Sequence, residues 1–281
     1  MTRQPETTLQ TMSVIVTGGA RGIGRATVER LARAGATVAV GDLDPDLAAE
    51  VTDGFGDRVV AAHLDVTDPA SWRAFLTEVE ALGPWDALVN NAGIMPLGSV
   101  LKEEDAVTRA IFEVNVHGPI NGIKAVTPAM VERGHGHIVN VASAVGRVAV
   151  PDGATYSASK FAVVGFSEAL RLELASSGVD VSLVLPSVVQ TELAAGVPPA
   201  KGMKPVTAEE VAATIESVLL DPRPETWVPN WTQTLTKVTQ AMPRRFQDAV
   251  DRATKASQLL AGVDPAARAA YDERVRRNVR Q

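Results

Sequence analysis

Short apolar runs rich in β-branched residues alternate with longer segments of helical periodicity along most of the chain. Seven of these runs are predicted to be strands, and they span Ser13–Thr17, Thr37–Gly41, Val59–His63, Asp86–Asn90, His137–Ala142, Val181–Leu185 and Thr226–Val228. Between the first six lie segments with helical spacing, such as Gly24–Ala34, Ser71–Leu82 and Ser157–Ser176. Strands that alternate with helices form a parallel sheet covered on both faces, and continuously apolar strands fit burial on both sides. The pattern therefore predicts an α/β fold with a doubly wound parallel sheet of about seven strands.

The length and composition fit one large domain followed by a short extension. With 281 residues, 46% of them hydrophobic, the chain can bury a large core. Strand signals stop after Pro229, so we expect residues 1–230 to form one domain and residues 231–281 a helical C-terminal extension. Within the extension, Asp264-Pro265 is typical of an N-cap followed by proline at the first helical position.

The composition argues against several classes of protein. The chain has no cysteine, which excludes disulfides and zinc–thiolate sites, and no metal site is predicted. A net charge of −6 argues against nucleic-acid binding. The N-terminus holds no apolar core of signal-peptide length, and no run of about 18 apolar residues occurs, so we expect a soluble cytoplasmic protein.

The stretch SVIVTGGARGIG at residues 13–24 places Gly18, Gly22 and Gly24 where the first strand gives way to a helix. At this turn of a doubly wound sheet, the pyrophosphate of a dinucleotide rests on the helix N-terminus. Glycines let the backbone approach the phosphates without a Cβ clash. A plain tight turn is the alternative, but the position between strand and helix favours a dinucleotide site.

An acidic residue, Asp42, ends the second predicted strand. A carboxylate at this position accepts hydrogen bonds from the adenosine ribose hydroxyls and repels a 2′-phosphate. The alternative is an ordinary solvated loop acid, because Asp44 and Asp46 follow at once. In its context Asp42 predicts NAD as the cofactor.

With these features the chain resembles the short-chain dehydrogenase/reductase family over about residues 12–230. The family's order and separations are kept by TGGARGIG, LDV at Leu64–Val66, NNAG at Asn90–Gly93, NVHG at Asn115–Gly118, Ser143, YSASK at Tyr156–Lys160 and PSVVQT at Pro186–Thr191. The resemblance implies a Rossmann-type fold and NAD(P)-dependent chemistry on alcohols or ketones. It also implies a cofactor site made of Gly18, Arg21, Gly22, Ile23, Gly24, Asp42, Asp65, Val66, Asn91, Ala92, Gly93, Tyr156, Lys160, Pro186, Val189 and Thr191.

Tyr156 and Lys160 are four residues apart at the start of a predicted helix, so their side chains share one face. A phenol has a pKa of about 10, and a nearby ammonium lowers that pKa toward the range that acid–base catalysis needs. A Tyr–Lys pair on a solvated helix face is the alternative. Ser143 ends the fifth predicted strand, at the edge of the sheet where ligands bind.

The resemblance implies a role for each member of the catalytic set. Tyr156 exchanges a proton with the substrate oxygen, and Ser143 hydrogen-bonds that oxygen. Lys160 holds the nicotinamide ribose and lowers the tyrosine pKa. Asn115 fixes a helix kink whose carbonyl binds a relay water.

Pro119 lies four residues after Asn115, in a stretch that should be one helix. Proline has no N–H for the carbonyl at i−4, and its ring pushes that carbonyl aside. We therefore expect the carbonyl of Asn115 to lack a helix partner and to hold a water.

One position departs from the family's usual pattern without affecting the cofactor prediction, and another is of a kind also found in NADP-binding members. Ser187 follows Pro186 where the family usually has glycine, which puts the local turn in doubt. Arg21 is a basic residue of the kind also found in NADP-binding members, but repulsion of the 2′-phosphate by Asp42 should outweigh its attraction.

The segment Leu193–Pro205 has the composition of a loop. In the family this region covers the substrate, and its small apolar residues suggest an apolar alcohol or ketone.

The tail carries stripes of apolar residues at helical spacing, which most often mark core or subunit contacts. The stripes are Trp231, Leu235, Val238 and Met242, then Phe246, Val250, Ala253 and Leu260, then Tyr271, Val275 and Val279. The tail is also basic, with 11 Lys and Arg against 7 Asp and Glu in residues 221–281, so contact with an anionic membrane is an alternative.

Assembly into a homotetramer is expected from the resemblance, with a dimer as the second choice. The helices around Val107–Val131 and Ser157–Ser176 resemble those that pair subunits in the family, and Phe161, Val164 and Leu172 are candidates to face a partner.

The sequence thus predicts an NAD-dependent oxidoreductase that acts on an apolar secondary alcohol or ketone. The alternatives are an NADPH-dependent carbonyl reductase, a dinucleotide-sensing regulator without catalysis, and a membrane-associated scaffold that uses the tail.

Overall fold

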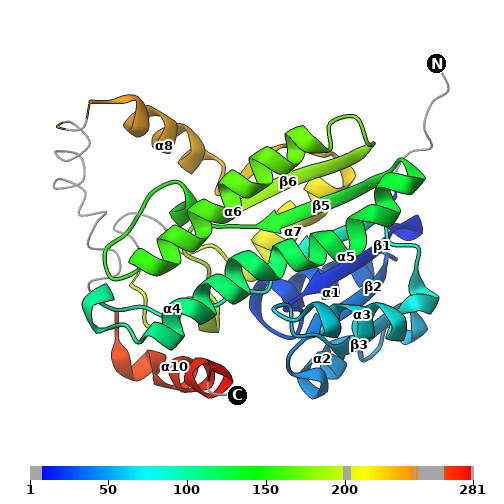
Figure 1. The fold of residues 1–281 in the computed structure, drawn as a ribbon, viewed down its shortest axis with the longest axis horizontal. Coiled ribbons are helices and arrows are strands. Elements are labelled where there is room, and N and C mark those ends of the chain that lie inside the picture. The colour runs from blue at the N-terminus through cyan, green and yellow to red at the C-terminus, as the bar shows by residue number, and fades with distance from the viewer. Residues whose placement is uncertain (1–7, 199–203, 244, 246–262, 280–281) are drawn as a thin grey trace.

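The computed structural model describes residues 8–198, 204–243, 245 and 263–279, and Figure 1 shows a sheet flanked by helices. Seven strands pair in parallel in the order β3-β2-β1-β4-β5-β6-β7. They are β1 (Ser13–Thr17), β2 (Thr37–Asp42), β3 (Val59–His63), β4 (Ala87–Asn90), β5 (Gly136–Val141), β6 (Val179–Pro186) and β7 (Glu225–Val228). The predicted doubly wound α/β sheet is confirmed.

Strand boundaries differ from the predicted ones by at most two residues, and β1 and β3 match them. The largest difference is at β6, which begins at Val179 and not at Val181. Asp180 is exposed between two buried valines, so a polar residue interrupts the apolar run that marks the strand. Asp180 nevertheless pairs in register with His137 of β5.

Helices cover both faces of the sheet and bury two separate apolar layers. Alternate residues of one strand point to opposite faces, so Val14 and Val16 enter one layer while Ile15 enters the other. The first layer is closed by α1 (Gly22–Arg33), α2 (Pro45–Thr52) and α7 (Ala208–Leu220). The second is closed by α3 (Pro69–Glu78), α5 (Gly118–Arg133) and α6 (Ala154–Glu173).

The helix α2 occupies a segment whose acidic residues had suggested a loop. Asp44 is its N-cap and accepts a hydrogen bond from the N–H of Leu47 at 3.1 Å, with Pro45 at the first helical position. The acidic run after β2 is therefore in part a helix start, which is where Asp is favoured.

The helix expected around Val107–Val131 is divided into α4 (Asp105–Phe112), a π-helical turn (Glu113–His117) and α5. In this turn the N–H of Gly118 donates to the carbonyl of Glu113, an i+5 bond. Pro119, the second residue of α5, has no N–H to continue the regular α pattern across this point. A π turn of this kind is frequent at functional sites.

Two described helices follow the sheet. Trp231, Leu235, Val238 and Met242 lie exposed in and just after α8 (Trp231–Ala241). The other helix, α10 (Pro265–Val279), starts at the predicted Asp264-Pro265 boundary, and Asp264 accepts a hydrogen bond from the N–H of Ala266 at 2.9 Å. Phe246, Val250, Ala253 and Leu260 lie outside the described residues.

Only two of the three residues expected to face a partner are exposed. Phe161 and Leu172 are 43% and 67% exposed on α6, but Val164 is buried in a core cluster with Leu183 and Leu185 of β6. The expectation for Val164 is therefore wrong, because it lies on the side of α6 that packs on the sheet. In the described part of the chain, no helix is long and apolar enough to span a membrane.

Candidate active site

One cavity of about 930 Å³ lies at the carboxyl ends of β1, β4, β5 and β6. The strand order reverses between β1 and β4, and ligands of doubly wound sheets bind at this switch point. All the predicted catalytic and cofactor residues line the cavity except Gly24 and Asn115. Over the described residues, no group of three or more His, Cys, Asp or Glu is placed to hold a metal ion.

The three glycines of the first turn are required for two different reasons, which are a positive φ and close backbone packing. Gly18 and Gly22 have φ values of 64° and 50°, in the left-handed region that favours glycine. Gly24 lies in α1, and a Cβ on it would come 2.0 Å from the carbonyl oxygen of Gly18. The glycines therefore allow a tight turn and close packing of the helix beneath it, and they leave a cradle that fits a pyrophosphate.

The turns after β1 and β4 are locked together by side chains. The hydroxyl of Thr17 accepts hydrogen bonds from the N–H groups of Asn91 and Ala92 at 3.0 and 3.1 Å. The amide of Asn91 in turn donates to the carbonyls of Thr17 and Gly18, each at 3.0 Å. These bonds fix the two strand ends that border the cavity near the switch point.

Asp42 is held by the backbone around it. Its two carboxylate oxygens accept from the N–H groups of Ala20 at 3.0 Å and Asp44 at 3.1 Å. Each oxygen keeps a further lone pair for a ligand hydroxyl. Arg21 forms ion pairs with Asp44 at 3.4 Å and with Glu192 at 3.5 Å, so acidic groups surround the one basic residue of the turn.

Ser187 keeps the turn after β6 regular despite the loss of the family's glycine. Its N–H donates to the carbonyl of Val228 at 2.9 Å, which extends the pairing of β6 with β7. Its φ is not positive, so a side chain causes no strain here. Thr191 lies close to the glycine turn, since a Cβ on Gly22 would meet the Thr191 Cγ2 at 3.1 Å.

Tyr156 is buried in the cavity wall at the start of α6, and Ser143 lines the same cavity. Burial raises the pKa of Tyr156 above its ordinary value, and the hydroxyl of Ser143 opposes that rise in part. The expectation that Lys160 makes this pKa low is not met here, because loss of hydration is the largest effect. The phenol is therefore held in its protonated form, which is the form that donates a proton to a carbonyl.

Lys160 lies beside Tyr156 on the buried face of α6. Its Nζ is 5.9 Å from the centroid of the Tyr156 ring and donates to the carbonyl of Val141 at 3.2 Å. Burial lowers the pKa of Lys160 to about 8. The Tyr–Lys pair thus lies in a buried site, and the solvated helix face that was the alternative is excluded.

Asn115 lies behind the cavity wall and supports it. Its side-chain oxygen accepts from the N–H of Ile94 at 2.8 Å, and its amide donates to the Ile94 carbonyl at 2.9 Å and to Ser159 at 3.0 Å. The π turn that carries Asn115 is thereby tied both to the segment after β4 and to α6, so it positions the wall on which Tyr156 lies.

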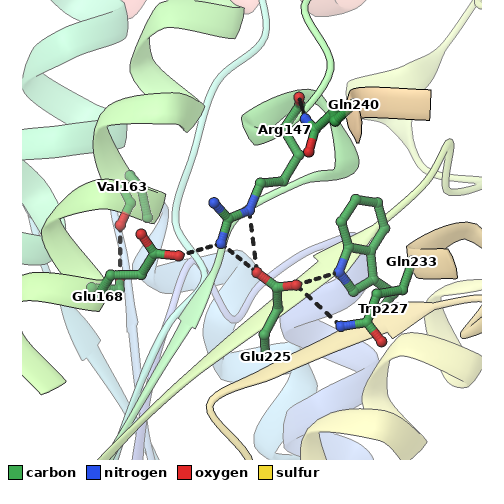
Figure 2. A network of polar contacts seen from close by, with 8 residues as sticks. Arg147, Val163, Glu168, Glu225, Trp227, Gln233 and Gln240 are labelled. Atoms are coloured by element: carbon green, nitrogen blue, oxygen red, sulfur yellow. Dashed lines mark hydrogen bonds and ion pairs between the residues drawn. The ribbon is translucent and has the colours of Figure 1, made fainter. Parts of the chain in front are cut away.

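A network of charged and polar groups holds the loop that follows Ser143 (Figure 2). Arg147 pairs with Glu168 of α6 and with Glu225 of β7. Glu225 also accepts hydrogen bonds from Trp227 at 2.7 Å and from Gln233 of α8 at 3.2 Å. This network anchors α8 and holds the loop after β5 against α6 and β7.

The helix α10 also borders the site, although none of its residues is among the predicted site residues. Ala270, Tyr271, Arg274, Val275, Arg277 and Asn278 all line the cavity. The helical stripe containing Tyr271 and Val275 predicted a buried face, and both residues are buried. Sequence spacing could not show that this face covers the mouth of a cavity built by strands more than eighty residues away.

Comparisons with known proteins agree with the site. The sequence pattern of the short chain dehydrogenase family matches residues 12–202. A 3-alpha-(or 20-beta)-hydroxysteroid dehydrogenase of Mycobacterium bovis is 39% identical over 187 residues, which are 66% of this chain and 71% of that protein. A 2,5-dichloro-2,5-cyclohexadiene-1,4-diol dehydrogenase of Sphingobium indicum is 38% identical over 190 residues, which are 66% and 76% of the two chains.

A solved structure shares the fold as well as the sequence pattern. It is a short chain dehydrogenase/reductase from Burkholderia phymatum in complex with NAD, 26% identical, with a TM-score of 0.74 over 82% of this chain and 92% of that one. With the glycine turn, the buried Tyr156 and the matched sequence pattern, these likenesses show that the chain belongs to the short-chain dehydrogenase/reductase family of oxidoreductases.

Proposed function

We propose that this protein transfers a hydride between NAD(H) and an apolar secondary alcohol or ketone, with Tyr156 as the acid–base group. The observation that carries the proposal is the buried Tyr156 together with Ser143, which share one cavity with the glycine turn and Asp42. The named relatives act on cyclic alcohols or steroids, which agrees with this substrate class.

In the proposed mechanism, the protein fixes the reacting oxygen and moves one proton. Ser143 and Tyr156 hydrogen-bond the oxygen of the substrate. Tyr156 donates its proton to a ketone oxygen in reduction, or removes the proton of the alcohol in oxidation. Lys160 holds the nicotinamide ribose, and its charge favours the phenolate that forms during reduction. NAD supplies the hydride acceptor or donor when it is bound.

Cofactor choice follows from the charges around the first turn. A 2′-phosphate brought to Asp42 meets that carboxylate and the carboxylate of Asp44, while Arg21 already pairs with Asp44 and Glu192. Repulsion in this region supports NAD over NADP. An NADPH-dependent reductase would need Arg21 to leave both partners.

The experiment is a panel of cyclic secondary alcohols and hydroxysteroids incubated with NAD or NADP, followed by NADH or NADPH absorbance. We expect oxidation of apolar alcohols with NAD and at most a tenth of that rate with NADP. Tight NAD binding with no turnover of any substrate would instead support a dinucleotide-sensing regulator.

We also propose a homotetramer. Phe161 and Leu172 remain exposed on α6, and the α8 stripe adds Trp231 and Leu235, so apolar surface is available for subunit contacts. Light scattering at micromolar concentration should report four chains, and a monomer would contradict the proposal.

A further inference from the structure

The helix α10 is attached to the site by one buried arginine. Arg268 is only 2% exposed, and its guanidinium donates to the carbonyls of Leu193 at 3.0 Å, Ala195 at 3.3 Å and Met95. It also forms an ion pair with Asp272, one helical turn away, at 3.1 Å. The helix is thereby connected both to the segment after β4 and to the loop after β6.

Such an arrangement specifies one position of the helix. A buried guanidinium is costly unless hydrogen bonds and a counter-charge satisfy it. Here three backbone carbonyls accept from the two terminal nitrogens and the Asp272 carboxylate supplies the counter-charge, although the buried Nε forms no hydrogen bond among the described residues. Close backbone packing adds to the constraint, because a Cβ on Gly196 would come 2.5 Å from the carbonyl oxygen of Asp264. We therefore regard α10 as a fixed wall of the cavity.

Tyr271 is one of the polar residues that this wall brings to the cavity, together with Arg274, Arg277 and Asn278. It is 6% exposed, and the guanidinium carbons of Arg268 and Arg274 lie 4.6 and 5.5 Å from its ring centroid. Its hydroxyl accepts a hydrogen bond from the N–H of Met95 at 2.7 Å. The ring and the oxygen are thus held on both sides, and the phenol has one orientation.

The proton of this phenol has no acceptor among the residues that the structure describes. A tyrosine hydroxyl that accepts one hydrogen bond still has its own proton to donate, and among the described residues no bond from this hydroxyl is formed. A buried donor without an acceptor is unfavourable. The site therefore favours a ligand that brings an acceptor to this position.

Tyr271 also lies within electrostatic reach of Tyr156. A charge on Tyr271 raises the pKa of Tyr156, and the charge of Arg268 lowers it. Both phenols belong to the same cavity, so one small molecule can contact both.

We propose that Tyr271 is a specificity-determining residue that donates a hydrogen bond to a second oxygen of the substrate, on a carbon other than the reacting one. The substrate class is then an apolar cyclic alcohol or ketone with a second hydroxyl, keto or ether oxygen. This inference rests on the proposed function for the reacting oxygen. The binding contact itself does not require turnover.

The test compares ligands that share a carbon skeleton. Dissociation constants of cyclohexanol and of 1,4-cyclohexanediol for the NADH complex are measured by ligand-observed NMR, for the wild type and for Tyr271→Phe. The wild type should bind the diol about fivefold tighter than cyclohexanol, the gain of about one net hydrogen bond. Tyr271→Phe should lose this preference while its affinity for cyclohexanol stays within twofold.

Two further variants separate the hydrogen bond from the position of the helix. Val275→Ala changes the same wall without removing a polar group, so it should leave the diol preference unchanged. Arg268→Met releases α10 and should weaken both ligands. If Tyr271→Phe weakens both ligands alike, as Arg268→Met does, or keeps the diol preference, the proposal is wrong.

Turnover is measured separately with NAD on the same two alcohols. If the wild type oxidises neither of them nor any other alcohol of the panel, the proposed function fails. The ratio of the two dissociation constants still decides the role of Tyr271 in that case.

Discussion

The Nζ of Lys160 lies 5.9 Å from the ring centroid of Tyr156 and donates to the carbonyl of Val141 at 3.2 Å. Both side chains are buried, and burial acts on them in opposite directions: it raises the pKa of Tyr156 and lowers the pKa of Lys160 to about 8. Loss of hydration disfavours the charged form of each group. The site thus holds two groups whose charged forms are destabilised until a ligand brings compensating interactions.

Replacing Tyr156 by Phe removes the proton donor and keeps the ring that packs in the cavity wall. We expect turnover to fall by about 10²–10⁴, which is the contribution of acid–base catalysis. NAD affinity measured by calorimetry should stay within a few-fold, since the phenol contributes little to cofactor binding. Turnover within threefold of the wild type would show that another group transfers the proton.

Replacing Lys160 by Met should lower turnover and raise stability at neutral pH. The folded-state pKa of about 8 lies below the unfolded value of about 10.5, so below pH 8 the buried ammonium destabilises the fold. In the wild type this cost, up to about 3 kcal/mol, disappears as the pH rises from about 8 to 10.5.

Urea unfolding of the wild type and of Lys160→Met at pH 7 and pH 10 measures this effect. The stability advantage of the variant should be largest at pH 7 and shrink toward pH 10. The bond to Val141 is lost in the variant, which reduces the gain by about 1 kcal/mol. An advantage that does not change with pH would mean that the ammonium is hydrated in the folded protein.

Asp42→Asn removes the charge of Asp42 and keeps one of its two backbone hydrogen bonds. The amide oxygen of asparagine can still accept from Ala20 N–H, which Asp42 holds at 3.0 Å, but the negative charge is gone. We expect the wild type to bind NAD at least tenfold tighter than NADP, a difference of about 1.4 kcal/mol. The variant should reduce this ratio mainly by binding NADP more tightly, and calorimetry with both cofactors measures it. Equal binding of the two cofactors by the wild type would refute the assignment.

The sheet and the residues at its carboxyl edge were predictable because they depend on local signals. Apolar strands, glycines with positive φ and an acidic strand end are each visible within a few residues of sequence. Gly18, Asp42 and Tyr156 reach one cavity because the strand order of a doubly wound sheet brings those ends together.

The position of α10 against the cavity could not be predicted, because it depends on contacts that the local sequence does not show. The helix is held by hydrogen bonds from Arg268 to the backbone carbonyls of Met95, Leu193 and Ala195. Every residue has a backbone carbonyl, so the sequence does not show which ones will accept these bonds. From the sequence alone, an arginine in a helix with several other arginines is expected to be exposed to solvent. The direction of the Tyr156 pKa shift was missed for a similar reason, since desolvation depends on the whole shell around the phenol and not on Lys160 alone.

His137 should make the fold sensitive to acid. It is buried on β5 with its Nε2 2.8 Å from the hydroxyl of Ser182, and burial lowers its pKa to about 4. The unfolded value is about 6.5, so the unfolded chain binds a proton more readily between these two pH values. The stability that comes from keeping His137 neutral in the fold is fully present above about pH 6.5. Up to about 3 kcal/mol of it is lost as the pH falls to about 4.

The measurement is urea unfolding at pH 7.5 and at pH 5, for the wild type and for His137→Gln. The variant keeps a polar side chain near Ser182 but does not titrate in this range, so its stability should fall less between the two pH values. Equal losses in both proteins would mean that His137 keeps an ordinary pKa in the fold.

Pro119→Ala tests whether the π turn before α5 serves the chemistry. The turn already has an i+5 bond from Gly118 N–H to the Glu113 carbonyl, and Pro119 offers no N–H to the carbonyl of Asn115. Alanine supplies that donor, so the segment can close into a regular α-helix.

Thermal unfolding of Pro119→Ala should then show equal or higher stability, since a proline inside a helix costs about 3 kcal/mol unless the bend absorbs it. We propose that the Asn115 carbonyl accepts from a water that carries protons from Lys160 to solvent. Pro119→Ala would remove that acceptor, so turnover should fall while NAD affinity stays unchanged. A high-resolution crystal structure of the wild type should show that water within hydrogen-bond distance of the carbonyl oxygen. If turnover of Pro119→Ala equals that of the wild type and the oxygen accepts a backbone N–H instead, the proline is a tolerated irregularity with no part in proton transfer.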